Sequence, residues 1–367
     1  MTDRSLLAVN AGSSSVRLDL FSGPSRVKQS HLKGEDIDAA AALRTFAEGA
    51  PTVGVVAHRV VHGGPRLQAA CVVSEEVEAE IRRVAGLAPL HNPLALRWME
   101  ASRQVFGAGA VQVAAFDTAF YANLPDVSRR YALPKALVER HGVRRYGFHG
   151  LAHAAMLQRW QAGAGQRSAA RVISLQMGAG CSITASRGGE AVDTSMGFSP
   201  VEGLVMATRC GDLDPGLVTY LQAQEQMTPA QMEDLLNRRS GLLGMAADAD
   251  MQRLLARTDP DASAAVDLYC YRARKYVGAY LAALGGADAI LFGGGVGENA
   301  PQIRARILRG MQWCGIELDE DANRTAEKEA RVSTSGSGIE GWVIPVDEAQ
   351  IIAAQARELL KDTADHE

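Results

Sequence analysis

Two segments of this chain share one pattern, in which an apolar strand runs into a Gly/Ser-rich turn and then into a second strand. The first has apolar residues at 6–9, the turn NAGSSS at 10–15 and alternating apolar and charged residues at 16–20. The second has apolar residues at 171–175, followed by QMGAGCS at 176–182. Alternation around a tight polar turn is typical of a β-hairpin. One such hairpin in each half of the chain predicts a duplicated fold.

The turn of the first hairpin offers backbone N–H groups, three hydroxyls and one amide, which together can surround a phosphate without a helix. Arg17 would add positive charge there. A plain hairpin turn explains the same residues equally well. A Walker A loop is excluded, because the pattern GxxxxGK[ST] does not occur in the sequence.

The composition favours two domains and gives no sign of a nucleic-acid or membrane partner. The chain has 367 residues, 47% of them hydrophobic, which is enough for more than one packed core. The net charge of −4 comes from scattered charges of both signs, so no basic surface for nucleic acid is expected. No apolar run approaches the roughly 20 residues that cross a bilayer. Five separate cysteines without a CxxC pair, and no signal-peptide pattern, predict a reduced cytoplasmic protein without structural zinc.

Charged side chains follow two predicted strands. Arg59 lies near the end of the strand that starts at Val53, between His58 and His62, and such a group could bind an anion. Asp117 closes the strand at 111–116, where an acidic residue can hold magnesium. The simpler alternative for Asp117 is a helix N-cap.

Two later segments also point to a binding site. Residues 193–215 contain too many Gly and Pro for a regular element, yet are too apolar for a solvated linker, so we expect them to fold back into a cleft with Arg209. A buried loop with a surface arginine is the alternative. The sequence GGGVGEN at 293–299 follows a strand and opens a helix, as in nucleotide sites. It also fits GxGxxA, which keeps a dinucleotide site open.

Other parts of the chain carry no chemical signal. Residues 22–50 are expected to form a surface connection with one helix at 37–46. Residues 216–285 read as mostly helical with a break near 240–244, and 349–361 as a terminal helix.

Taken together, the motifs resemble those of the acetate and propionate kinase family from Asn10 to Glu348. The nine segments that carry the resemblance occur in the family order: NAGSSS, HRVVHGG, APLHNP, FDTAF, RRYGFHG, DTSMGFSPVEGL, TRCGDLDP, GGVGEN and VIPVDE. The chain is shorter than a typical member, mostly before HRVVHGG.

The resemblance implies an α/β fold made of two ribonuclease-H-like domains, as in sugar kinases, actin and Hsp70. The N-terminal domain would comprise 1–121 and 350–367, and the C-terminal domain 122–349, with the nucleotide site and a dimer surface. It further implies a homodimer that transfers the γ-phosphoryl group of ATP to a short carboxylate, with Mg²⁺ required.

The resemblance also assigns roles to residues at matching positions. Arg59 and Arg209 would grip the carboxylate and the transferring phosphoryl group, which suits a reaction that joins two anions. His149 would donate a hydrogen bond to that phosphoryl group, with support from His91. No strong general base is needed, because a carboxylate oxygen is already a nucleophile.

The remaining positions fall into three groups. Mg²⁺ would be held, directly or through water, by the amide of Asn10 and the carboxylates of Asp117 and Glu348. Phosphate and nucleotide contacts would be Asn10, Ser13, Ser15, Arg17, Gln176, Gly178, Gly180, Gly295, Val296 and Asn299. The substrate pocket would be Val61, Leu90, His91, Phe148 and Pro200. The branched side chain of Val61 favours acetate over propionate, by an amount in the range of about 1–3 kcal/mol for one methylene.

Several residues depart from the family pattern. The family usually has HLGNG where this chain has QMGAG, so Gln176 replaces a histidine and Ala179 an asparagine. An alanine side chain cannot donate a hydrogen bond, which leaves the grip on the donor phosphates open. Lysine is usual at Arg17 and histidine at Tyr121. The alternatives are therefore a propionate or butyrate kinase, a kinase that uses pyrophosphate, and a non-catalytic ATP-dependent switch.

The role of Arg209 can be tested against its neighbour Cys210. We expect Arg209→Ala to cost far more turnover than Cys210→Ala, because only the arginine would contact the transferring group. Steady-state rates of the two purified variants give the comparison. Equal losses would show that the arginine has been given the wrong role.

Overall fold

The protein is described by a computed structural model that covers residues 5–12, 15–34, 36–164 and 169–364. The chain forms two compact units. Unit 1 comprises Met1–Ala122, Phe148–Leu151 and Asp347–Glu367, and unit 2 comprises Asn123–Gly147 and Ala152–Val346. The domain bounds expected from the sequence differ from these mainly at 148–151, and the domain assignment itself stays a prediction.

Unit 1 is built on a six-stranded mixed sheet in the order β3-β2-β1-β4-β6-β5. Its strands are β1 (Ser5–Ala11), β2 (Ser15–Ser22), β3 (Ser25–Lys33), β4 (Val53–Val60), β5 (Cys71–Val72) and β6 (Val111–Phe116). Strand β1 pairs antiparallel with β2 and parallel with β4, which pairs parallel with β6. The carboxyl ends of β1, β4 and β6 therefore meet at one edge of the sheet.

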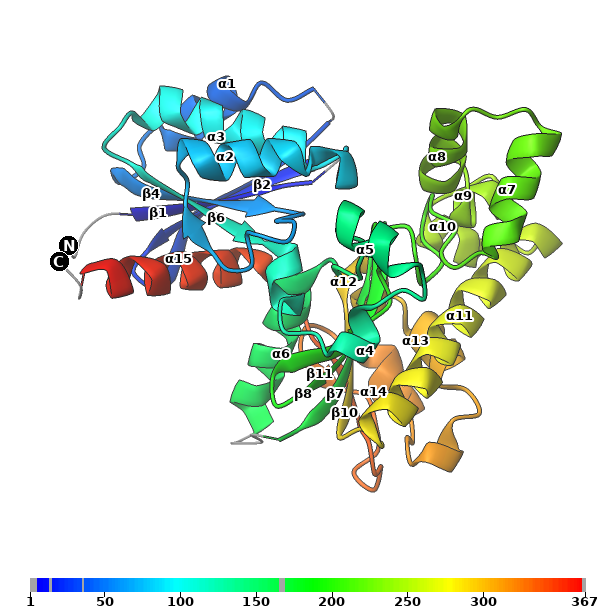
Figure 1. The fold of residues 1–367 in the computed structure, drawn as a ribbon. Coiled ribbons are helices and arrows are strands. Elements are labelled where there is room, and N and C mark those ends of the chain that lie inside the picture. Colours follow the sequence, from blue (N-terminus) through cyan, green and yellow to red (C-terminus); the bar gives the residue numbers. More distant parts are fainter. Residues whose placement is uncertain (1–4, 13–14, 35, 165–168, 365–367) are drawn as a thin grey trace. The chain divides into compact units, whose positions relative to one another are not determined.

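Helices cover both faces of this sheet. One face carries α1 (Ala39–Ala47), α2 (Glu75–Arg83) and α3 (Asn92–Phe106), and the other carries α15 (Glu348–Ala364) (Figure 1). Short 3₁₀ turns lie at Ala85–Leu87 (η1) and Asp117–Tyr121 (η2). The core is formed by the alternating apolar residues of the first hairpin, such as Leu7, Val9 and Leu18, with Trp98 of α3. The hairpin predicted from the sequence is thus the centre of unit 1.

Unit 2 repeats the strand order of unit 1. Its sheet, read from the opposite end, has the order β9-β8-β7-β10-β12-β11. The strands are β7 (Arg171–Met177), β8 (Cys181–Arg187), β9 (Glu190–Thr194), β10 (Ala289–Gly293), β11 (Ala330–Arg331) and β12 (Glu340–Val343). As in unit 1, three antiparallel strands are followed by two parallel ones. The predicted duplicated ribonuclease-H-like α/β fold is confirmed.

The helices of unit 2 are more numerous. In chain order they are α4 (Asp126–Arg129), α5 (Lys135–His141), α6 (Gly150–Ala164, whose first two residues belong to unit 1), α7 (Pro215–Gln224), α8 (Pro229–Arg238), α9 (Gly241–Ala246), α10 (Met251–Ala256), α11 (Pro260–Leu284), α12 (Gly294–Asn299), α13 (Pro301–Leu308), η3 (Gln312–Cys314) and α14 (Glu320–Thr325). None of the helices in the described part of the chain is long and apolar enough to cross a membrane.

Two of these helices lie on opposite faces of the unit 2 sheet. Tyr269 of α11 hydrogen-bonds Cys181 at 3.4 Å, whereas His153 of α6 hydrogen-bonds the neighbouring Ser182 at 2.9 Å. Successive residues of a strand point to opposite faces, so the two contacts place the helices on either side. Figure 1 shows α6 and α11 flanking β7 and β8 in this way.

One sequence-based expectation for the connections was wrong. Residues Ser25–Lys33 form β3, not a surface connection. This edge strand carries charged and exposed side chains, with Leu32 packed on the core, so its apolar signal is weak. The break expected near 240–244 is present between α8, which ends at Arg238, and α9, which begins at Gly241.

The buried histidine of α6 makes the stability of the fold depend on pH. Burial lowers the pKa of His153 to about 3. The unfolded chain takes up the proton below a pKa of about 6.5, so stability falls as the pH drops from there toward the folded pKa. Between pH 7 and 5 we expect this histidine to cost about 2 kcal/mol in the free energy of unfolding.

Urea unfolding of the wild type and the His153→Gln variant at the two pH values measures this effect. The variant should lose about 2 kcal/mol less than the wild type on acidification. The matched control is His141→Gln, which replaces an exposed histidine and should leave the difference unchanged. An equal acid loss in all three proteins would contradict the prediction.

Candidate active site

Arg59 is the centre of a polar cluster at the carboxyl edge of the unit 1 sheet. It lies near the end of β4, and its Nε and Nη2 atoms donate to the two carboxylate oxygens of Asp117 at 3.1 and 2.7 Å. Its Nη1 donates to Asn10 Oδ1 at 3.1 Å and lies 3.7 Å from Glu348 Oε2. The Asn10 amide also donates to Glu348. The structure therefore brings together four of the predicted site residues, from β1, β4, η2 and the first turn of α15.

Burial and charge act against each other in this cluster. Burial alone would lower the pKa of the Arg59 guanidinium, but the charges of Asp117 and Glu348 raise it above its ordinary value. Burial raises the pKa of Asp117, while the pair with Arg59 and the backbone N–H of His149 oppose that rise. A bidentate Arg–carboxylate pair of this geometry fixes both side chains in orientation. Arg59 is thus held rigidly with its positive charge intact.

The two histidines beside Arg59 do not share its environment. His58 is buried, where it hydrogen-bonds Gln112 at 2.8 Å, and burial lowers its pKa to about 4. His62 is buried too, and its ring meets Phe148 edge-on with the centroids 5.5 Å apart. The expectation of an anion clamp made of an arginine and two histidines is therefore wrong for the histidines. The N-cap alternative for Asp117 is also wrong, because its carboxylate binds Arg59.

The segment from Phe148 to Gly150 packs directly against the end of β6. The Phe148 side chain is buried, and His149 has a left-handed backbone with φ of 58°. Gly150 lies so near η2 that a Cβ atom there would come within 2.0 Å of the Asp117 carbonyl oxygen. This close approach sets the backbone of His149 beside the Asp117 carboxylate.

The other unit 1 candidates lie around this segment. Val61 is buried just after β4, while Leu90 and His91 are half-buried at the start of α3. In the first hairpin, the Gly12 N–H donates to the Ser15 carbonyl at 2.9 Å. Arg17 is exposed on β2. Ser13 lies outside the described residues.

The donor set in unit 1 is compatible with magnesium. Within residues 5–12, 15–34, 36–164 and 169–364, no three His, Cys, Asp or Glu side chains gather as ligands for a metal. Asp117 and Glu348 do supply two carboxylates beside the amide oxygen of Asn10. Magnesium commonly takes one or two carboxylates and completes its shell with water and substrate phosphates. The residues present therefore fit this ion.

In unit 2 the two glycine-rich turns lie side by side. Strand pairing places Gln176 opposite Gly293, so the hairpin turn after β7 adjoins the turn between β10 and α12. Gly294 has φ of 76°, and a Cβ atom there would lie 2.6 Å from the Met177 carbonyl oxygen. Only glycine permits both this backbone and this approach.

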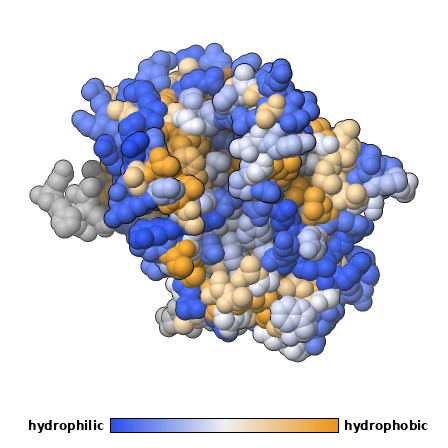
Figure 2. Space-filling model, turned by 45° about the vertical axis from the view of Figure 1, so that its right-hand side comes forward, coloured by the Kyte–Doolittle hydropathy of each residue, from blue (hydrophilic) through white to orange (hydrophobic). Residues whose placement is uncertain are grey.

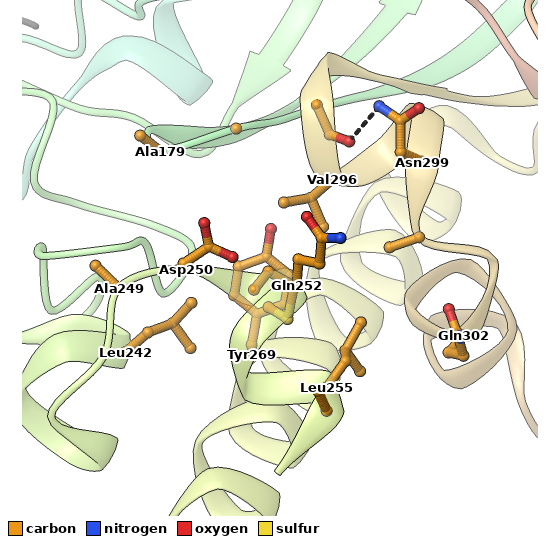
Figure 3. A pocket seen from close by; sticks show the side chains of 15 residues that line it. Ala179, Leu242, Ala249, Asp250, Gln252, Leu255, Tyr269, Val296, Asn299 and Gln302 are labelled. Carbon is orange, nitrogen blue, oxygen red and sulfur yellow. Dashed lines mark hydrogen bonds between the residues drawn. The ribbon is translucent and has the colours of Figure 1, made fainter.

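A cavity of about 820 Å³ opens beside these turns. Gly178 and Ala179 contribute one part of its lining, and Gly295, Val296 and Asn299 another (Figure 3). The Asn299 side chain donates to the Gly295 carbonyl at 2.9 Å. The cavity thus unites four predicted nucleotide contacts, whereas Gln176 and Gly180 do not line it.

The rest of the lining was missed by the sequence reasoning. Leu242, Met251 and Leu255 give apolar surface, and Asp250 and Gln252 give polar groups. Figure 3 shows Leu242 and Leu255 on the side of the cavity away from Ala179 and Val296. The only local signal for this wall is the N-cap Asp250 at the start of α10, which does not by itself indicate a ligand.

Arg209 has no acidic partner, in contrast to Arg59. Its Nη1 donates to the Pro200 carbonyl at 3.3 Å and lies 3.7 Å from Met206 Sδ. No carboxylate of the described residues pairs with it, and burial lowers its pKa. The same loop reaches the cavity turn, because Ala207 N–H donates to the Ala179 carbonyl at 3.0 Å. A half-buried cation without a carboxylate partner is suited to an anionic ligand.

Gln176 also has an unsatisfied group. Its Oε1 atom is buried and accepts no hydrogen bond from the described residues. Gln176 lies near the end of β7, the strand that leads into the glycine turn. The departure from the family pattern therefore leaves a buried amide beside the turn.

Comparisons with known proteins agree along most of the chain. The model of the acetokinase family matches residues 38–354. An acetate kinase from Solibacter usitatus is 44% identical over 325 residues, which cover 87% of this chain and 78% of the relative. The crystal structure of Porphyromonas gingivalis acetate kinase matches with a TM-score of 0.88 at 33% identity, covering 97% of this chain and 100% of that one. A propionate kinase from Francisella tularensis gives 0.88 at 30% identity, covering 96% and 98%.

The packing of Gly150 on η2 can be tested by adding one methyl group. Gly150→Ala forces a Cβ atom against the Asp117 carbonyl oxygen and should lower the free energy of unfolding by about 3 kcal/mol. Gly278→Ala is the control, because no atom lies within 4 Å of its added Cβ and alanine favours helix α11 by about 1 kcal/mol. Denaturant unfolding compares the two. A Gly150→Ala protein as stable as the wild type would rule out the close packing.

Proposed function

The chain belongs to the acetokinase family, and from this we propose that it transfers the γ-phosphoryl group of ATP reversibly to acetate, giving acetyl phosphate and ADP. It is a phosphotransferase with a carboxyl group as acceptor. The observation that carries the proposal at the site is the half-buried guanidinium of Arg209, which pairs with no carboxylate of the described residues and lies in the loop that hydrogen-bonds the cavity turn. Such a charge suits an anionic substrate or transition state.

The two arginines would have different tasks. Arg59 is oriented by Asp117, so it can offer charge only in a fixed direction. Arg209 is held by a carbonyl and a thioether, so its charge is not offset by a carboxylate. We assign the pair to the acetate carboxylate and the transferring phosphoryl group, with His149 as a hydrogen-bond donor to the latter and His91 in support. Positioning and charge stabilisation then supply most of the rate.

Asp117 does not serve as a general base in this proposal. Its carboxylate oxygens accept two hydrogen bonds from Arg59 and one from the backbone of His149. Acetate is already ionised at neutral pH and attacks through its own oxygen, so no proton has to be removed. The absence of a free base is consistent with direct transfer.

The acyl pocket would be formed by Val61, Leu90, His91, Phe148 and Pro200. The Phe148 ring is fixed by its edge contact with His62, and the Tyr121 hydroxyl donates to the Phe148 carbonyl at 2.9 Å. Rigid apolar walls with a branched valine favour the two-carbon acid over longer ones. Tyr121, where the family usually has histidine, thus has a structural role.

ATP is supported as the donor by the cavity in unit 2. A volume of about 820 Å³ with apolar walls and a few amides suits a nucleoside. Pyrophosphate has no base or sugar that could occupy this cavity. None of the lining residues of this cavity is a lysine or an arginine. The phosphates would therefore be held at the edge of the cavity, by the backbone of the turn at Gly178 and Gly180, with Gln176 beside this turn. In the first hairpin, Asn10, Ser13, Ser15 and Arg17 would complete the phosphate contacts.

Magnesium is proposed as the metal that accompanies ATP. Asp117, Glu348 and Asn10 would hold it directly or through water. When bound, it would offset negative charge on the phosphates. The residues of the chain would then position the donor and acceptor and exclude competing water.

A cytoplasmic homodimer is also proposed. In unit 2, large apolar side chains are exposed on α7 and α11, among them Leu217, Tyr220 and Tyr271. On the face shown in Figure 2, hydrophobic patches lie among hydrophilic side chains. Exposed apolar surface of this kind is common at subunit interfaces. Free cysteines, with no disulfide recorded, agree with a reducing compartment.

The proposed reaction is tested by trapping acyl phosphate with hydroxylamine. Acetate, propionate and butyrate are each supplied with ATP or pyrophosphate, and with Mg²⁺. We expect product with acetate and ATP and less with propionate, because the donor and acyl pockets fit the first pair best. We expect no product after chelation of the metal, because Mg²⁺ would offset the charge of the phosphates.

The role of Arg209 in this reaction is tested with a lysine variant. Arg209→Lys keeps the positive charge but loses the forked guanidinium geometry, and should reduce turnover by at least about tenfold.

In the hydroxylamine assay, product with pyrophosphate and none with ATP would overturn the choice of donor. No product with any pair would favour a non-catalytic switch.

A further inference from the structure

A small polar network lies under the loop that carries Pro200 and Arg209. The Arg145 Nη2 atom donates to Glu202 Oε1 at 2.6 Å, and the Tyr131 hydroxyl donates to Glu202 Oε2. The Arg145 guanidinium also lies over the Tyr131 ring, 5.6 Å from its centroid. All three side chains belong to unit 2, and none was singled out by the sequence. They form a connected set of one cation, one anion and one hydroxyl.

The network also holds the main chain of the loop. Phe198 N–H donates to the Tyr131 hydroxyl oxygen at 2.8 Å, and Arg145 Nη1 donates to the Ser195 carbonyl at 3.2 Å. Arg145 Nε reaches back to the Ser128 carbonyl at 3.2 Å, which ties the loop to α4. The Tyr131 hydroxyl therefore donates to a carboxylate and accepts from the loop at the same time. Loss of this one oxygen would release both.

Gly197 shows how closely the loop is seated on these side chains. A Cβ atom at this position would lie 1.7 Å from Glu202 Oε2 and 2.0 Å from the Tyr131 hydroxyl. Real Cβ atoms essentially never come this close to another atom, so the loop rests directly on the network. Tyr146 N–H adds a bond to the Gly197 carbonyl at 3.0 Å.

Burial and charge act on two members of the network. Burial alone would lower the pKa of Arg145, but the charge of Glu202 raises it above its ordinary value. Burial raises the pKa of Tyr131, so its hydroxyl keeps the proton that it donates to Glu202. Breaking one member of this half-buried charged set leaves the others uncompensated.

The network is linked to the reaction through Pro200. This residue lies two positions after Phe198, and its carbonyl accepts the hydrogen bond of Arg209 at 3.3 Å. The other recorded partner of the Arg209 guanidinium is the weak acceptor Met206 Sδ. The place of Arg209 therefore depends on where the Pro200 carbonyl is held. A displacement of about 1 Å at a group that binds the reacting atoms can cost a large factor in rate.

We propose that Tyr131, Arg145 and Glu202 are positioning residues that fix Pro200 and, through its carbonyl, Arg209, and so set the affinity and chain-length preference for the carboxylic acid substrate. This inference rests on the proposed function, since it concerns the acyl side of that reaction. The network is separate from the nucleotide cavity of unit 2, because none of its members lines that cavity. The network should therefore affect the acid substrate and leave the nucleotide unaffected.

The test is Tyr131→Phe, which removes one oxygen and keeps the ring. We expect the KM for acetate to rise about tenfold and the KM for ATP to stay within about twofold. The ratio of kcat/KM for acetate over propionate should fall by several-fold, because the wall at Pro200 is loosened. Tyr146→Phe is the matched control, since its hydroxyl donates to the Gly142 carbonyl outside this loop. The Tyr146→Phe variant should change neither the two KM values nor the ratio of kcat/KM for acetate over propionate.

A second variant covers the case in which Tyr131→Phe folds poorly. Glu202→Gln keeps the shape and one acceptor oxygen but leaves Arg145 without its anion, and should give the same split between the two KM values. ADP binding by calorimetry and the melting temperature check that the rest of unit 2 is intact. Unchanged acetate kinetics in both variants, or equal changes for acetate and ATP, would overturn the positioning role. A wild-type protein that forms no acetyl phosphate would overturn the proposed function itself, and the inference with it.

Discussion

The bidentate pair between Arg59 and Asp117 fixes the end of the unit 1 sheet at which the site residues meet. It joins β4 to the residue after β6, and Arg59 also reaches Asn10 on β1 and Glu348 on α15. Removing one partner of a buried pair commonly costs about 3–5 kcal/mol, because the other charge is left unpaired. The same interaction gives the edge its rigidity and holds the Arg59 guanidinium in a fixed direction.

Unit 2 uses the same strand order for a different purpose. Its sheet edge ends in two glycine turns, where Gly294 lies so near the Met177 backbone that a side chain would not fit. A cavity of nucleoside size opens there, with no cationic side chain in its lining. Arg209 lies instead in the loop at 193–215, and the ion pair of Arg145 with Glu202 lies at the same loop. One duplicated topology thus provides a charged edge in unit 1 and an open edge in unit 2.

The sequence predicted the framework well and the connections less well. The hairpins at β1–β2 and β7–β8, and the strand ending at Phe116, were evident from apolar alternation and Gly/Ser turns. Strand β3 was not, because an exposed edge strand such as Ser25–Lys33 has almost no apolar face. His58 and His62 were placed beside an anion because they flank Arg59, although both side chains are buried. Neighbours along a strand point to opposite faces, so adjacency in sequence did not bring them together.

The sequence alone determined the duplicated fold, the family motifs and the positions of the glycine turns, because these follow from local backbone preferences and short patterns. Tertiary structure decided which charges are matched. It paired Arg59 with Asp117 from 58 positions along the chain, left Arg209 with a carbonyl and a thioether, and set Tyr131, Arg145 and Glu202 under one loop. Distances between distant residues depend on packing of whole elements, so no local pattern in the chain could have specified them.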